Sequence, residues 1–221
     1  MPKYLVTYRP ICMKPAGKTA IQAYGIPKYL DASCRREPDF ENPFPSITAL
    51  CRGRNFAPRL NVGDGIAYIT KSGFYEGLDE RHHRLTAMLE VIHRFESHED
   101  AEKWYREQNT VLPSNCMVDG NGPLPMDKTG GISSAELKRR VRGMSDEEAV
   151  RIWDLAYKAR VRANGVFLIC KAVDPIRLDS PPPILEGDWK EWCEGVPGTQ
   201  NPPRIEEPLW DKLRVRCRGL L

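Results

Sequence analysis

The sequence has no long apolar run. No uninterrupted apolar stretch of its 221 residues approaches the roughly 18 that a membrane-spanning helix needs. The opening segment, MPKYLVTYRP, has no apolar centre of the kind that a secretory signal peptide requires. We therefore expect a soluble, cytoplasmic protein without a membrane partner.

The sequence also has little excess charge of one sign. The formal net charge is +3 at pH 7, from 33 lysines and arginines against 30 aspartates and glutamates. A protein with this balance does not bind nucleic acid through overall charge alone. Any contact with nucleic acid must therefore come from a local basic patch.

Metal and cofactor motifs are absent as well. The seven cysteines form no CxxC pair, which favours reduced, mostly buried thiols over disulfides or structural zinc. A zinc site built from scattered ligands is disfavoured because structural zinc usually uses closely spaced pairs. Its ligands would be Cys34, Cys51, His82 and His83. No glycine-rich phosphate loop or catalytic triad is recognisable, so we predict no metal and no cofactor.

What the sequence does contain is a mixture of strand and helix signals. Runs of β-forming residues alternate with segments in which a serine precedes an acidic residue by three positions, as in a helix capping box. Ser97 with Asp100 and Ser145 with Glu148 are the two such pairs. The predicted strands lie near 3–9, 65–71, 84–95 and 166–174, and the predicted helices near 98–108, 134–143 and 146–163.

Two proline-rich segments interrupt this pattern. Residues 10–47 contain six prolines and read as a long irregular stretch, which in a compact domain usually carries function or short elements of its own. Residues 181–208 contain seven of the 19 prolines, so we expect this tail to cross the surface in extended form. Trp189, Trp192 and Trp210 would anchor it.

A basic loop leads directly into a segment built for burial. It reads CRGRNFAPRLNVGDGIAYIT from Cys51 onward, and it makes physical sense if the loop lines a cleft whose floor is the sheet. Arginines can hold phosphates, Asn55 can read the edge of a base, and Phe56 can stack or pack. A solvated arginine cluster with Phe56 in the core is the alternative, and for Asn55 the alternative is a structural role that ties the loop to the strand.

A second arginine pair, in the loop at 33–36, could join the same rim. Its alternative is a surface loop with local ion pairs that contribute little. The strand that leaves the basic loop would supply the rest of the pocket, although Tyr68 could equally pack in the core. The predicted nucleic-acid-binding residues are Arg35, Arg36, Arg52, Arg54, Asn55, Phe56, Arg59, Tyr68, Thr70 and Lys71.

The segment RGRNFAPRLNVGDGIAYITKSG resembles EVE domains, which belong with YTH and ASCH domains to the PUA-like superfamily. The run PSITALCRGRNFAPRLNVGD is also similar to bacterial and phage nucleotide-modification-associated domains. The resemblance covers residues 46–105 well and 165–185 loosely. It implies an α+β fold: a PUA-like mixed β-barrel with peripheral helices. In this chain the domain would span 1–180, with a helical insert at about 134–164, followed by a proline-rich C-terminal extension at 181–221 packed on it.

The same resemblance implies a module that binds nucleic acid or a nucleotide and reads a modified or flipped base beside the 52–59 loop. The alternative is an enzyme of nucleotide or nucleic-acid modification or cleavage, in a phage or bacterial DNA-modification or defence system. Its candidate catalytic groups would be Cys34, Asp39, Lys71 and His83, and a cysteine beside arginines would have a lowered pKa. The tail at 181–221 could in addition bind a protein partner.

Overall fold

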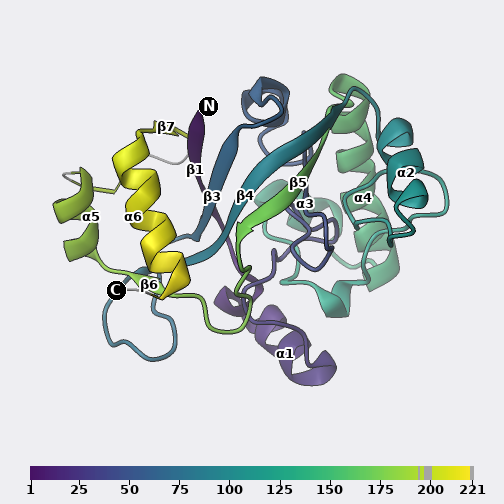
Figure 1. Ribbon diagram of the computed structural model, residues 1–221. Helices are drawn as coiled ribbons and strands as arrows, with labels where there is room; N and C mark the ends of the chain where they lie inside the picture. The colour runs from purple at the N-terminus through teal and green to yellow at the C-terminus, as the bar shows by residue number, and fades with distance from the viewer. Residues whose placement is uncertain (194, 197–200, 220–221) are drawn as a thin grey trace.

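The computed structural model describes residues 1–193, 195–196 and 201–219 (Figure 1). The strands are β1 (Lys3–Tyr8), β2 (Ser46–Thr48), β3 (Gly65–Thr70), β4 (His83–Phe95), β5 (Phe167–Asp174), β6 (Pro183–Ile184) and β7 (Arg204–Ile205). The α-helices are α1 (Pro15–Tyr24), α2 (His98–Glu107), α3 (Ala135–Arg140), α4 (Asp146–Ala163), α5 (Glu186–Cys193) and α6 (Glu207–Arg218). Short 3-10 helices are η1 (Ile11–Met13), η2 (Gly53–Asn55), η3 (Ala57–Arg59) and η4 (Met126–Lys128).

The strands form one mixed sheet in the order β2-β5-β4-β3-β1-β7, and β6 pairs with β4. The pairing of β1 with β3 is parallel, and every other pairing in the described part of the chain is antiparallel. A mixed fold of strands and helices is therefore confirmed. The predicted barrel is not confirmed, because β2 and β7 lie at opposite edges of the described sheet and it stays open.

Apolar residues of the central strands alternate between two cores. Val6 and Ile66 face a core that includes η1, α1 and the loops around residues 40–60, whereas Leu5 and Ala67 face a core made with α5 and α6. The period of two in a strand explains why β1 and β3 carry apolar residues at successive positions. Figure 1 shows α5 and α6 together on one side of the sheet.

The long strands and the two capped helices match the sequence prediction. The strands predicted near 3–9, 65–71, 84–95 and 166–174 correspond to β1, β3, β4 and β5. The Ser97 side chain accepts a hydrogen bond from the backbone N of Asp100, and Ser145 with Glu148 forms a complete capping box. Each cap satisfies backbone N–H groups that the first helical turn leaves without a partner.

The segment predicted as irregular contains a helix and a strand that the sequence reading missed. Helix α1 has Pro15 in its first turn and Gly25 in the left-handed conformation after its last, which is the usual asymmetry of helix ends. Gly17 is required in this helix, because a Cβ there would lie 1.9 Å from the carbonyl oxygen of Ile11. Strand β2 pairs with β5 at the sheet edge.

The C-terminal tail is more regular than expected. It forms α5, α6 and two short strands instead of running only in extended form. Trp189 and Trp210 are buried against the sheet and Trp192 packs beside them, so their predicted role as anchors holds. The parts of the prediction at 194, 197–200 and 220–221 lie outside the described residues. In the described part of the chain, no helix has the length and apolar character to cross a membrane.

Candidate functional site

The candidate site is a cleft at the carboxyl ends of the parallel strands β1 and β3. Tyr8 pairs with Thr70 at the end of both strands, and the backbone N of Lys71 donates to the carbonyl of Tyr8 at 2.8 Å. The residues that follow, Arg9 and Lys71, both line the cleft. Loops at the carboxyl ends of parallel strands are a common place for ligand sites, because the chain there is free to diverge from the sheet.

The opposite wall comes from the basic loop and from α4. Arg52 adopts a left-handed backbone conformation, with φ of 63°, and its guanidinium donates to the carbonyl of Thr7. The guanidinium of Arg160 lies 5.3 Å from the ring centre of Tyr157 and donates to the carbonyl of Leu50. Both arginines are therefore held at the cleft by backbone carbonyls on other segments.

The cleft is cationic and has a volume of about 700 Å³. This volume lies within the range of small-molecule sites, about 300–1,000 Å³. Its cationic lining residues are Arg9, Lys14, Arg52, Lys71 and Arg160. Two carboxyl groups, those of Asp31 and Glu37, also line it.

Glu37 is a buried acid to which no cation of the described residues is bonded. Its carboxylate accepts hydrogen bonds from the backbone N and the Oγ1 of Thr48 and from the Nδ2 of Asn115, the last at 3.0 Å. Burial outweighs these three hydrogen bonds and raises the pKa of Glu37 from 4.5 to about 8. The group can therefore exchange a proton near neutral pH.

Burial also raises the pKa of Asp31, although Ser33 donates to its carboxylate from its backbone N at 3.0 Å and from its Oγ. Protonation of either acid would make the cleft more cationic than the count of lining residues implies. Trp153 and Tyr157, both on α4 and both buried, also line the cleft.

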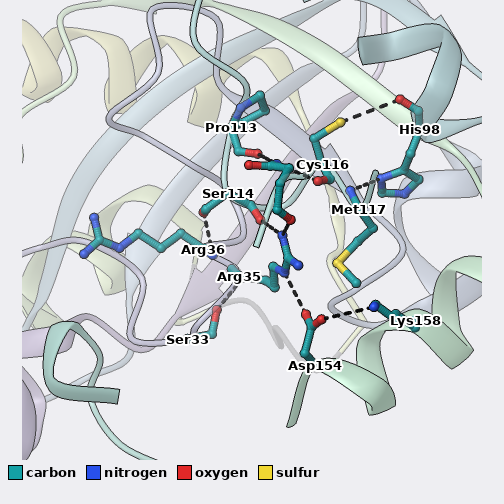
Figure 2. Close-up of polar contacts among 11 residues, drawn as sticks. Ser33, Arg35, Arg36, His98, Pro113, Ser114, Cys116, Met117, Asp154 and Lys158 are labelled. Carbon is teal, nitrogen blue, oxygen red and sulfur yellow. Dashed lines mark hydrogen bonds and ion pairs between the residues drawn. The ribbon is translucent and has the colours of Figure 1, made fainter. Parts of the chain in front are cut away.

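Of the predicted site residues, Arg52 and Lys71 line this cleft. Arg35 and Arg36 are instead buried, and Figure 2 shows the Arg35 guanidinium between Asp154 and the Ser114 backbone. Arg35 Nε lies 2.7 Å from Asp154 Oδ1, and its Nη1 donates to the carbonyl oxygens of Ser114 and Asn121. This arginine joins the 33–36 loop, the 109–133 loop and α4.

Arg36 forms an ion pair with Glu41 and is 3% exposed, so the predicted position of both arginines on the cleft rim is wrong. Phe56 packs edge-on against Tyr4, with ring centres 6.1 Å apart. It is buried, as the core alternative for this residue predicts.

The strand residues are also enclosed. Tyr68 packs in the core, where its ring centre lies 5.4 Å from that of Phe40. Thr70 is fully buried and accepts a hydrogen bond from the backbone N of Arg84 at 2.9 Å. Arg54, Asn55 and Arg59 are exposed outside the lining of the cleft. The structural alternative for Asn55, a buried side chain, is therefore wrong, and a contact with nucleic acid stays a prediction.

The candidate catalytic residues do not converge. Cys34 is buried beside Trp153, and Asp39 accepts a hydrogen bond from the backbone N of Ser114 at 2.7 Å. His83 is buried against Trp189 with its Nδ1 2.7 Å from the carbonyl oxygen of Thr70. Of the four candidates, Lys71 alone lines the cleft.

The predicted lowering of a cysteine pKa is wrong. Burial raises the pKa of Cys34, and it raises that of Cys51 to about 12, in spite of the neighbouring arginines. Among the described residues no three histidine, cysteine or acidic side chains are grouped so that they could hold a metal ion.

The sequence analysis misses three cations and both acids of the cleft, Asp31 and Glu37. Arg9 and Lys14 flank the 3-10 turn after β1, and Arg160 lies on α4, about 150 residues further along the chain. Arg9 directly follows β1, so its position at the end of a strand could have indicated a site residue. Nothing local distinguishes Arg160 from the other basic residues of α4, and Glu37 was read as part of a surface loop.

Comparison with protein-family models, curated proteins and solved structures gave no match. The geometry of the cleft is the structural observation that bears on its function.

Proposed function

We propose that the cleft at the ends of β1 and β3 binds a nucleotide unit, as a free nucleotide or within a nucleic acid. The observation that carries this proposal is the convergence of five cationic side chains from separate segments on one cleft of about 700 Å³. Lysine and arginine hold phosphate oxygens by charge-assisted hydrogen bonds. The resemblance to PUA-like domains points to the same ligand class.

The carboxyl groups fit the other end of such a ligand. A nucleobase presents N–H donors and acceptors along its edge, and a carboxyl group accepts from such donors. Glu37 in its protonated form would in addition donate one hydrogen bond. The cleft thus offers cations for a phosphate and acids for a base, and PUA-like modified-base recognition remains part of the proposal.

The test is fluorescence anisotropy with labelled single-stranded and double-stranded oligonucleotides at two salt concentrations, with mononucleotides as competitors. Lys71→Ala removes an exposed cation from the cleft and should lower the affinity. The slope of log K against log salt should fall by about one for each lost phosphate contact.

Arg204→Ala is the matched control, because it removes a positive charge from an exposed site on β7 that lies outside the cleft. It should leave the slope unchanged. Absence of salt-dependent binding would overturn the proposal, and so would a loss of affinity in Arg204→Ala with none in Lys71→Ala.

An enzyme acting on the same ligand is the second candidate, favoured by the buried Glu37 at the cleft. A carboxyl group with a pKa raised to about 8 can serve as a general acid or base near neutral pH. Mass spectrometry of oligonucleotides and nucleosides after incubation with the protein would detect any product. Activity that survives in Glu37→Gln would exclude this role for Glu37.

A further inference from the structure

A second cavity of about 610 Å³ lies between α1 and the loop that joins β3 to β4. It adjoins the first cleft along two segments of the chain. In the first segment, Lys14 lines the cleft, and Met13 and Lys18 line the second cavity. In the second segment, Lys71 lines the cleft and Ser72 lines the second cavity. Consecutive Cα atoms lie about 3.8 Å apart, so the two linings come within one residue of each other at 13–14 and at 71–72.

The second cavity carries an exposed aromatic side chain. Phe74 is 68% exposed, although a phenylalanine that makes no contact with a ligand gains nothing from exposure to water. The guanidinium of Arg81 lies 5.6 Å from its ring centre, and Arg81 is itself held by a hydrogen bond of 3.1 Å to the carbonyl oxygen of Ser72. The loop thus fixes a cation over one face of an aromatic ring that is otherwise largely exposed, so a base can stack only on the other face.

The charges of this cavity continue those of the cleft. Lys18 and Arg81 are exposed cations, and the one acidic side chain in its described lining, Glu76, forms an ion pair with Lys28. The lining is therefore cationic after local pairing is counted. In its described lining, the second cavity therefore presents no unpaired acid to an anionic chain that enters it from the cleft.

We propose that the ligand of the cleft is a single-stranded nucleic acid, and that its neighbouring nucleotide occupies the second cavity with its base stacked on Phe74. This inference rests on the proposed function, and it selects a strand over a free nucleotide. Every base has a π-face, so stacking on an aromatic side chain tolerates any sequence. Lys18 and Arg81 would contact the phosphates that flank the stacked base.

The experiment measures the affinity of a mononucleotide and of single strands of two, four and six nucleotides, with a duplex as a further ligand. The unmodified protein should bind the strands more tightly than the mononucleotide or the duplex. Phe74→Ala should weaken binding of the strands about five- to 150-fold, the usual range for loss of one stacking contact. It should leave the affinity for the mononucleotide and the melting temperature unchanged.

Val111→Ala is the control, since Val111 is an exposed apolar residue that lines neither cavity. Equal affinity for mononucleotide and strands, or unaltered binding in Phe74→Ala, would overturn this inference. Salt-dependent binding that is weakened in Lys71→Ala would in that case still support nucleotide binding in the cleft. Binding that depends on Phe74 but prefers the duplex would overturn the choice of a single strand. No binding of any nucleotide would overturn both proposals.

Discussion

Removal of the Arg35 guanidinium should destabilise the fold and leave the affinity for nucleic acid in the folded protein unchanged. Arg35 is 2% exposed and bonds to Asp154 and to two backbone carbonyl oxygens. Arg35→Met keeps most of the aliphatic stem, so the cavity it creates is small. It leaves the Asp154 carboxylate buried, with Lys158 at 3.8 Å as its nearest cation.

The expected loss follows from these contacts. Breaking a buried ion pair by removing one partner costs about 3–5 kcal/mol. The two carbonyl oxygens lose donors as well, at about 1 kcal/mol each. Lys158 offsets part of this, so we expect a loss of about 4 kcal/mol in the free energy of unfolding at pH 7.

Urea denaturation followed by circular dichroism measures this loss. The surface pair of Arg106 with Glu102 provides the control, and Arg106→Met should cost less than about 1 kcal/mol. The double variant Arg35→Met with Asp154→Leu should lose about 2 kcal/mol less free energy of unfolding than the two single variants lose in sum. A loss below 1 kcal/mol in Arg35→Met, together with a weakened affinity for oligonucleotides, would refute the structural role.

Three further outcomes are expected. The free energy of unfolding should fall as pH rises from about 4.5 to about 8, because the unfolded chain releases the Glu37 proton at a lower pH than the folded protein does. At about 1.36 kcal/mol per pKa unit, the total fall due to this group is up to about 5 kcal/mol. Glu37→Gln should flatten the corresponding decline of the urea midpoint with pH. An equal slope in that variant would contradict the pKa assignment. Trp189→Ala should lower the stability by about 3–5 kcal/mol, since the side chain is fully buried, and a melting temperature equal to that of the parent would show that α5 contributes nothing. Ser145→Ala should cost about 1 kcal/mol by removing the cap of α4, whereas Ser145→Asp, which keeps a capping oxygen, should restore most of it in the same urea titration.

The sequence predicts the long elements of this fold because their signals are local. An apolar run marks β5, and a serine followed by an acid three residues later marks the starts of α2 and α4. Helix α1 was missed because Pro15, with Pro10 and Pro27 on either side of the helix, is typical of a loop, although Pro15 stands where a helix tolerates proline. The open sheet could not be predicted, since closure depends on which strands form its edges.

The site was harder to predict than the fold because its residues meet only in three dimensions. In the sequence, Arg35 resembles an arginine on the rim of a cleft. Its ion-pair partner in the structure, Asp154, lies 119 positions further along the chain. Arg52 and Lys71 were predicted because the sequence indicates both the basic loop before β3, which contains Arg52, and the end of that strand, which Lys71 follows. Arg160 lines the cleft because α4 packs close to the basic loop in the folded protein, and the sequence does not show this packing.

The pairing of β1 with β7, which lies about 200 residues later in the chain, also fixes an order of events during synthesis. One side of β1 bonds to β3, and the other bonds to the β7 region, where the backbone N of Leu5 donates to the carbonyl of Pro203 at 3.1 Å. At 5–20 residues per second, β7 leaves the ribosome about 10 to 40 s after β1. Throughout that interval the outer edge of β1 is an unpaired strand edge, open to pairing with another nascent chain. A shield for this edge during translation, from the ribosome surface or a chaperone, would raise the yield of folded protein.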